Sequence, residues 1–302
     1  MKIDLSVIIC TYNRDKYIAE SITAIVNQIL DYPTCELLVI NNNSTDQTDS
    51  ICTNLLQSGF QFRYIIETTQ GLSAARNRGI QEAHGEILVF IDDDAMAREH
   101  FLKNILAMYQ KYPEMAASGG RIYPRFESKK PAWMSRFLVP LMSVIDKGNA
   151  VIPFKGSHYP IGANMAFRKE IIHEIGLFDT TLGRSGGNLQ GGEEKDIFNR
   201  IKAKGKAIYY LPDVEVDHVI PDARLEKSFI CKMGFGIGSS EQIRARNIGN
   251  SELLKAHMKE CMKWAASGIL FLFYLLSLSP SKGWMILRFR YWVSKGMFSK
   301  IN

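Results

Sequence analysis

One apolar run that ends in three acids constrains the fold of this chain most. The run is Ile87–Ile91, and Asp92, Asp93 and Asp94 follow it directly. An unbroken stretch of β-forming residues predicts a strand buried on both faces, as in parallel α/β sheets. Ligands of such sheets bind beyond the carboxyl ends of the strands, where these carboxylates would lie. A divalent ion such as Mg²⁺ or Mn²⁺ would relieve their mutual repulsion and bridge to phosphate, although a solvated acidic turn gives the same pattern.

Three more apolar stretches precede that run, and each leads into a segment whose apolar residues have helical spacing. The stretches are 5–10, 35–40 and 62–67, and the last helical segment begins at Gly71. The alternation makes three strand-helix-strand crossovers, which predicts a parallel, doubly wound sheet in an α/β fold. Residues 124–158 contain four prolines and no clear period. They predict a long excursion over the sheet, of the kind that often covers a substrate.

The carboxyl-terminal part of the chain is basic and apolar. The chain has 302 residues, 46% apolar composition and a net charge of +6. Between Lys263 and Lys282, the run Trp264–Leu278 carries no charge, and arginines alternate with aromatic residues after Trp284. A membrane span needs about 20 apolar residues, so this run equally fits a helix that lies in the interface. We expect an anionic membrane surface, and no nucleic acid, as the partner of this region; hydrophobic helices packed on a domain are the alternative.

Cysteine usage favours a reducing compartment. The five cysteines form no Cys-x-x-Cys pair and no Cys/His cluster with zinc spacing, so we expect ordinary thiols. The first residues lack the apolar core of a signal peptide and begin a strand almost at once. We therefore expect a cytoplasmic protein, associated through its basic region with the inner face of the cell membrane.

Four polar turns follow the predicted strands, at residues 11–14, 41–46, 70–77 and 92–94. Parallel strands bring these turns to one edge of the sheet, where backbone amides, Asn side chains and the helix start at Gly71 could hold a nucleotide. The chain has neither Gly-x-Gly-x-x-Gly nor a phosphate loop with Gly-Lys-Ser. Classical dinucleotide oxidoreductases and P-loop enzymes are therefore disfavoured.

Five motifs in one order carry a resemblance to a known family. They are Ser6–Arg14, Leu38–Asp46, Gly71–Gly79, Phe90–Asp94 and Gly192–Asp196. With these motifs the chain resembles the inverting nucleotide-sugar glycosyltransferases of family 2, which have the GT-A fold. The resemblance implies a GT-A domain over 1–225, with a nucleotide-binding half (1–122) and an acceptor half (123–225). Residues 226–302 would form the helical, apolar and basic extension.

The resemblance also implies which residues bind the donor and the divalent metal. The implied nucleotide-binding residues are Thr11, Tyr12, Arg14, Asn41, Asn42, Gly71, Arg76, Asp92 and Asp93. The implied metal ligands are Asp94, Asp92 and His218, with Mn²⁺ or Mg²⁺ as the cofactor. For His218, a hydrogen-bonded structural histidine is the alternative.

Glu194 matches the catalytic base of the family. A carboxylate at a helix start can take the proton of an attacking hydroxyl, and inversion needs a single in-line displacement. Glu193 is the adjacent candidate, although side chains of neighbouring helical residues point about 100° apart. Both acids would also stabilise a helix start without any catalytic role. The implied acceptor residues are Gly162, Ala163, Asn164 and Glu193.

The chain departs from the family pattern after the second strand, where Asn41–Asn43 stand in place of an acid that contacts the base in many relatives. A UDP-sugar is the favoured donor, and a glycan or lipid-linked hydroxyl is the expected acceptor, in surface polysaccharide or glycolipid synthesis. The Gln-x-x-Arg-Trp motif of processive relatives is absent. A nucleotidyltransferase and a catalytically degenerate sugar-nucleotide-binding or scaffold protein are the alternatives.

Overall fold

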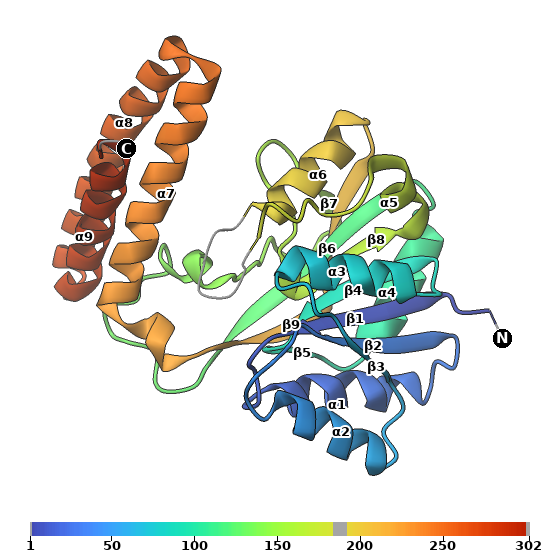
Figure 1. Cartoon of the computed structure of the whole chain (residues 1–302). Helices are drawn as coiled ribbons and strands as arrows, with labels where there is room; N and C mark the ends of the chain where they lie inside the picture. Colours follow the sequence, from blue (N-terminus) through green and yellow to red (C-terminus); the bar gives the residue numbers. More distant parts are fainter. Residues whose placement is uncertain (1, 184–191, 300–302) are drawn as a thin grey trace. The chain divides into compact units, whose positions relative to one another are not determined.

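The computed structural model describes residues 2–183 and 192–299 (Figure 1). The chain forms two compact units, and each is discontinuous in sequence. The first comprises Met1–Pro124 and Ser143–His218, and the second comprises Arg125–Met142 and Val219–Asn302. A functional division at residues 225 and 226 stays a prediction.

A mixed sheet forms the centre of the first unit, with the strand order β3-β2-β1-β4-β8-β6-β9-β5 and β7 paired to β9. The strands are β1 (Leu5–Thr11), β2 (Cys35–Asn41), β3 (Arg63–Ile66), β4 (Ile87–Asp92), β5 (Ala95–Ala97), β6 (Met115–Phe126), β7 (Ile152–Pro153), β8 (Met165–Arg168) and β9 (Ala207–Ile220). Strands β1 to β4 pair in parallel, which confirms the doubly wound α/β fold predicted from the apolar runs.

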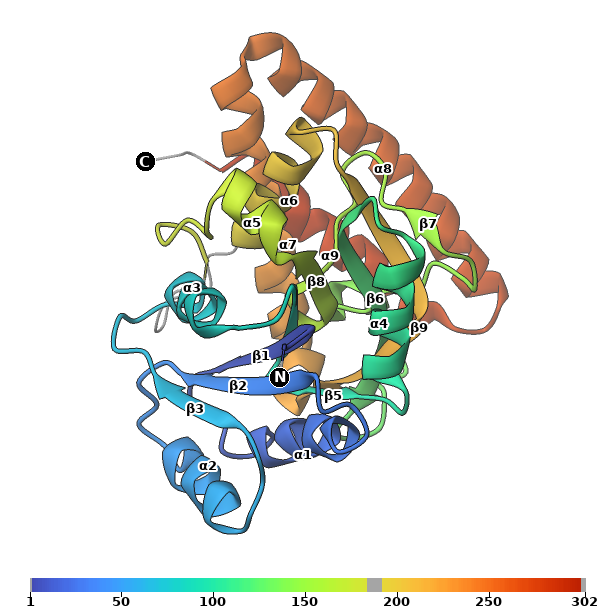
Figure 2. The same cartoon turned by 90° about the vertical axis from the view of Figure 1, so that its right-hand side faces the viewer.

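Helices cover both faces of the sheet (Figure 2). The helices of this unit are α1 (Ile18–Ile29), α2 (Thr48–Gln57), α3 (Leu72–Glu82), α4 (Phe101–Lys111), α5 (Lys169–Ile175) and α6 (Glu193–Ala203). Alternate residues of β1 belong to different cores, because successive strand side chains point to opposite faces. Val7 packs with residues of α1 and α4, whereas Ile8 packs with residues of α3, α5 and α6.

The remaining ladders recorded for this sheet are antiparallel. Strand β8 pairs with β4 on one side and β6 on the other, and β9 pairs with β5 and β7. Strand β9 runs unbroken from Ala207 to Ile220 through Pro212. It thereby carries His218 to a position opposite Ala95, just after the acids that follow β4.

The second unit is mainly a bundle of three helices, α7 (Lys227–Ile248), α8 (Asn250–Leu276) and α9 (Pro280–Met297) (Figure 1). Short 3₁₀ turns, η1 (Val139–Met142) and η3 (Asp222–Leu225), belong to the same unit, and η2 (Gly162–Asn164) to the first. Gly238 of α7 lies against the backbone of Val293, and Gly296 of α9 lies against that of Phe235. Any side chain at these glycines would force the two helices apart. Among the described residues, no helix is both long and apolar enough to cross a membrane.

Candidate active site

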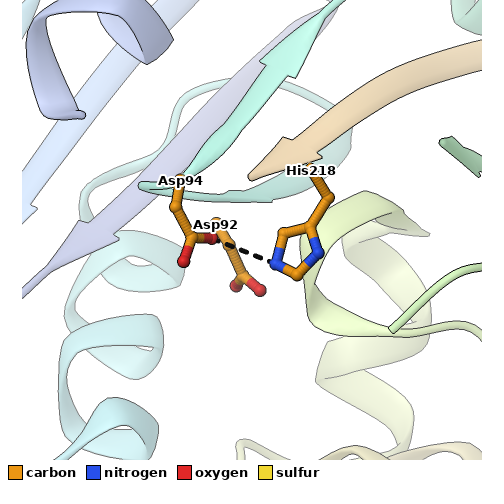
Figure 3. Close-up of side chains that lie close together, drawn as sticks. All are labelled: Asp92, Asp94 and His218. Atoms are coloured by element: carbon orange, nitrogen blue, oxygen red, sulfur yellow. Dashed lines mark ion pairs between the residues drawn. The ribbon is translucent and has the colours of Figure 1, made fainter. Parts of the chain in front are cut away.

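Two carboxylates and one imidazole converge beyond the end of β4 (Figure 3). Asp92 ends β4, Asp94 precedes β5, and His218 lies on β9 beside Ala95. One potential ligand atom of each residue lies within 4.8 Å of the others, and His218 Nε2 lies 3.2 Å from Asp94 Oδ1. Asp94 and His218 are buried. Oxygen ligands with one imidazole suit Mn²⁺ or Mg²⁺, so this donor set fits the metal that the sequence implied.

The second nitrogen of His218 bears on its alternative role. Nδ1 is buried and has no hydrogen-bond partner among the residues that the structure describes. An unpaired buried nitrogen is costly in either role, because a histidine that binds a metal through Nε2 normally also has a partner for Nδ1. A ligand role for His218 therefore stays a prediction.

Arg14 lies against the other acids of this turn. Its Nε donates to Asp93 Oδ1 at 3.2 Å, and its Nη2 lies 3.5 Å from Asp94 Oδ2. Burial, together with the charge of Asp94, raises the pKa of Asp93 to about 7, although Arg14 opposes the rise. Arg14 thus offers a fixed positive charge beside the carboxylates, as the predicted nucleotide contact requires.

Arg76 joins these acids to the start of α6. The side chain is only 2% exposed, and its Nη1 lies 3.1 Å from Glu193 Oε1. Its Nη2 lies 3.3 Å from Glu194 Oε1 and 3.8 Å from Asp92 Oδ1. One nitrogen of a buried guanidinium thus contacts both the candidate base and a candidate metal ligand.

The backbone of η2 holds Glu194 from the other side. The Gly162 N–H donates to Glu194 Oε1 at 2.8 Å, and this carboxylate lies in the first turn of α6. Burial raises the pKa of Glu194 to about 7 against the opposing charge of Arg76, and the charges of Glu193 and Asp92 add to the rise. A carboxyl group with such a pKa can accept a proton near neutral pH. Glu193 is more deeply buried and has an unpaired Oε2 among the described residues.

Replacing Gly162 by Ala is expected to displace the candidate base. An added Cβ would collide with Arg76 Nη2 and Glu194 Oε1, since no space separates them from Gly162. A displacement near 1 Å can cost about 100-fold in rate, so we expect kcat to fall by about that factor while the donor still binds. Steady-state kinetics and donor titration check this expectation. An unchanged kcat in a correctly folded variant would mean that Glu194 need not occupy this position.

The amides of Asn41 and Asn42 are engaged within the loops at this edge. Asn41 donates to the Tyr64 hydroxyl and accepts from the Ser44 N–H. Asn42 donates to the carbonyls of Glu67 and Thr69 and accepts from the Gly71 N–H. Asn42 thus holds the loop before α3, whereas Asn41 links β2 to β3 and to the turn after β2. Contact of either residue with a nucleobase stays a prediction.

The other predicted residues occupy the same unit. Thr11 is the buried end of β1, Tyr12 is more exposed, and Asn164 donates to the carbonyls of Arg121 and Val214. Ala163 is fully buried within η2, and contact of this stretch with an acceptor stays a prediction. Sequence reasoning missed Phe178, whose ring centroid lies 5.4 Å from the Arg76 guanidinium carbon. Nothing in the local sequence around Phe178 indicates this contact.

The doubly wound sheet and its acidic edge define a GT-A type fold, and comparisons with known proteins agree. Residues 6–176 match the model of glycosyl transferase family 2. The chain therefore belongs to glycosyltransferase family 2.

Two curated relatives illustrate the family. The glucosyl-dolichyl phosphate glucuronosyltransferase of Haloferax volcanii is 24% identical over 247 residues, which is 79% of this chain and 76% of the relative. The GalNAc(5)-diNAcBac-PP-undecaprenol beta-1,3-glucosyltransferase of Campylobacter jejuni is 36% identical over 92 residues, covering 30% of this chain and 29% of the relative.

Two solved structures share the fold at 18% identity. The mannosyltransferase PcManGT from Pyrobaculum calidifontis, in complex with GDP-Man and Mn²⁺, has a TM-score of 0.65 and aligns over 99% of this chain and 88% of its own. S. aureus TarS 1-349, in complex with UDP, has a TM-score of 0.55 and aligns over 97% and 91%. Both confirm the GT-A architecture.

Proposed function

We propose that the protein is a metal-dependent, inverting glycosyltransferase that moves one hexose from a nucleotide sugar to a hydroxyl acceptor. The observation that carries the proposal is the shared contact of Asp92 and Glu194 with one nitrogen of Arg76. This contact brings a candidate base and a candidate metal ligand into a single site. Such proximity suits a displacement in which proton removal and departure of the diphosphate occur together.

In the proposed reaction, Glu194 Oε accepts the proton of the acceptor hydroxyl. The hydroxyl oxygen forms a bond to the anomeric carbon while the bond from that carbon to the diphosphate oxygen breaks. A divalent ion held by Asp92, Asp94 and His218 would, when bound, neutralise charge on the departing nucleoside diphosphate. Arg14 adds positive charge beside the same acids. A single displacement of this kind inverts the anomeric configuration.

Arg76 is proposed to position the base rather than to bind the donor alone. It is buried among Glu193, Glu194 and Asp92, so each carboxylate has a fixed partner before substrate arrives. The arrangement also limits the rise in the pKa of Glu194 that burial causes. We retain Thr11, Tyr12, Gly71 and Asp93 as donor contacts, and the stretch 162–164 with Glu193 as the acceptor side.

The proposed substrates are a UDP-sugar and a glycan or lipid-linked acceptor, in the assembly of surface polysaccharide or glycolipid. The two named relatives support a lipid-linked acceptor by the substrates in their names. The proposed location is the cytoplasmic side of the cell membrane, and the free thiols of the five cysteines support a reducing compartment.

Release of the nucleotide tests this proposal, as the diphosphate from UDP-, GDP- and dTDP-sugars and as CMP from CMP-sugars. The purified protein would be incubated with UDP-, GDP-, dTDP- and CMP-sugars, with Mn²⁺ or with EDTA, and with simple glycosides as acceptors. We expect metal-dependent release from one nucleotide class and a product whose anomeric configuration, read by NMR, is opposite to that of the donor. Retention of configuration, or equal release in EDTA, would overturn the inverting or the metal-dependent part of the proposal.

The pH dependence of transfer gives a separate prediction. Glu194 must be deprotonated to act, and its pKa is raised to about 7, so kcat/KM is expected to rise with pH through about 7 and then level off. Asp93 has a similar pKa, so the Asp93→Asn variant is the control. If the rise of kcat/KM near pH 7 survives this substitution, it belongs to the titration of Glu194. If the rise disappears, its assignment to Glu194 would be contradicted.

A further inference from the structure

The last part of α8 and the turn that follows it carry exposed apolar side chains without any charge. Between Trp264 and Leu278 there is no Asp, Glu, Lys or Arg. Six large apolar residues there, which we name the apolar tip, are 47% to 91% exposed. The apolar tip consists of Ile269, Leu272, Phe273, Leu275, Leu276 and Leu278. Soluble monomers rarely expose so many neighbouring apolar residues without a partner surface.

A groove lined by aromatic and basic side chains lies in the same unit. Its volume is about 790 Å³. We name it the tryptophan groove. The lining residues used below are Trp133, Trp264, Trp284, Tyr291, Lys227 and Arg288. No acidic residue is among those that line it, and neither basic side chain has an ion-pair partner among the described residues. The groove therefore combines apolar walls with unneutralised positive charge.

The tip and the groove are physically joined. The ring of Trp284 packs edge-on against Phe271, which lies within the uncharged run, with centroids 5.0 Å apart. Trp264 is held in place by donating to Ser294 Oγ at 2.8 Å. Ser294 in turn donates to Glu260, which is buried and paired with Arg290. Packing and hydrogen bonds thus fix the orientation of both indoles.

The charge of α9 matches an anionic surface. The helix contains Lys282, Arg288 and Lys295, besides Arg290, which is paired with Glu260, and it has no acidic residue of its own. Indole and phenol rings favour the boundary between headgroups and acyl chains, and basic side chains near it are attracted to anionic lipid. A second copy of this chain would bring the same positive charge, which would repel rather than complement it.

From these observations we propose that the apolar tip and the tryptophan groove form a membrane-docking surface for bilayers that contain anionic phospholipid. The apolar tip enters the acyl region, and the tryptophan groove holds one lipid, with its phosphate against Lys227 and Arg288. The inference rests on the proposed function for its choice of a lipid surface. Binding to vesicles requires no sugar transfer, so the two proposals can fail separately.

Vesicle binding of the full chain tests this surface. Vesicles of phosphatidylcholine alone would be compared with vesicles that contain phosphatidylglycerol, by co-sedimentation and by quenching with brominated acyl chains. All four tryptophans belong to the second unit, so their fluorescence reports on that unit alone. We expect binding that needs phosphatidylglycerol, weakens with salt and brings quenching. If the chain bound neither kind of vesicle, the proposal would be overturned.

Two variants separate the tip from the groove. Leu276→Ser with Leu278→Ser is expected to lower the vesicle partition coefficient at least tenfold, because both side chains are highly exposed and would lose apolar insertion without any change of charge. Lys227→Glu with Arg288→Glu is expected to lower it by about 30-fold on anionic vesicles only, since each basic residue contributes about 1 kcal/mol near such a surface. Both variants should fold, because their side chains point to solvent.

Matched controls in the first unit test whether the losses of vesicle binding are specific to this surface. Leu30→Ser changes a leucine of the first unit that is 73% exposed, and Lys103→Glu with Lys155→Glu makes the same charge change as the groove variant on exposed residues there. We expect these controls to bind vesicles as the unmodified chain does. Equal losses of vesicle binding in the controls would mean that the effect is not specific to the tip and the groove, which would contradict the proposal. A tip variant that only turns a dimer into a monomer, with vesicle binding intact, would assign the surface to a second copy and contradict the proposal.

Discussion

Replacing Asp94 by Asn is expected to lower the rate of sugar transfer by about three orders of magnitude and to remove its response to Mn²⁺. The carboxylate lies 3.2 Å from His218 Nε2 and belongs to the only group of metal-ligand side chains found among the described residues. A bound metal contributes several kcal/mol of charge stabilisation, and each 1.36 kcal/mol corresponds to about tenfold in rate. Transfer rates measured across a Mn²⁺ titration check the prediction.

The control for Asp94 is Asp213→Asn, which changes an exposed acid of the same unit on β9. That variant should keep both the rate and the metal response. If Asp94→Asn retained the metal response of the unmodified chain, the three side chains in Figure 3 would not be the metal site. A loss of folding is recognised separately, by circular dichroism.

Replacing Glu194 by Gln is expected to lower kcat by about two to four orders of magnitude and to leave donor affinity nearly unchanged. The amide cannot accept the acceptor proton, whereas it can still accept the Gly162 N–H. Single-turnover transfer and calorimetric titration with the nucleoside diphosphate measure the two quantities. Glu193→Gln is the matched variant, because both acids contact Arg76. If Glu193→Gln lost more activity than Glu194→Gln, the base would be Glu193.

The Glu194→Gln variant should also be more stable than the unmodified chain at high pH. The folded pKa of Glu194 is raised from 4.5 to about 7, so folding favours the protonated carboxyl. This contribution to stability is complete below pH 4.5 and is lost as the pH rises through about 7. We expect a gain on the order of 1 kcal/mol at pH 8 and none at pH 4.5 in denaturant unfolding. Lower stability at both pH values would indicate that the ion pair with Arg76 dominates.

Local sequence pattern predicted the parallel half of the sheet because each element there is consecutive in the chain. Strands β1, β2 and β4 are unbroken apolar runs, and their pairing follows from short right-handed crossovers. The insertion of β8 between β4 and β6 was not predictable in the same way. Its pairing joins residues about 80 apart in sequence, such as Leu88 and Phe167, and no local period encodes such a contact.

The residues of the site also divide into those whose position follows from local sequence and those that meet only in the folded chain. The acids after β4 follow from the position of strand ends, whereas Arg76 and Glu193 are separated by 117 residues and meet only in the folded chain. The resemblance to the family assigned Arg76 to the nucleotide, and its burial among acids became evident only from the structure. Likewise, the hydrogen bonds that occupy Asn41 and Asn42 depend on Tyr64 of β3 and on the loop that follows this strand.

A thermal-shift experiment shows whether the cluster in Figure 3 makes donor binding depend on a metal, as the proposed function requires. The unmodified chain and Asp94→Asn would be melted with UDP-, GDP-, dTDP- and CMP-sugars, each with Mn²⁺ or EDTA, since a ligand that binds only the folded state raises Tm. We expect Tm to rise with the sugars of one nucleotide class, only in Mn²⁺ and only in the unmodified chain. An equal rise in EDTA or in the variant, or no rise with any donor, would contradict this expectation.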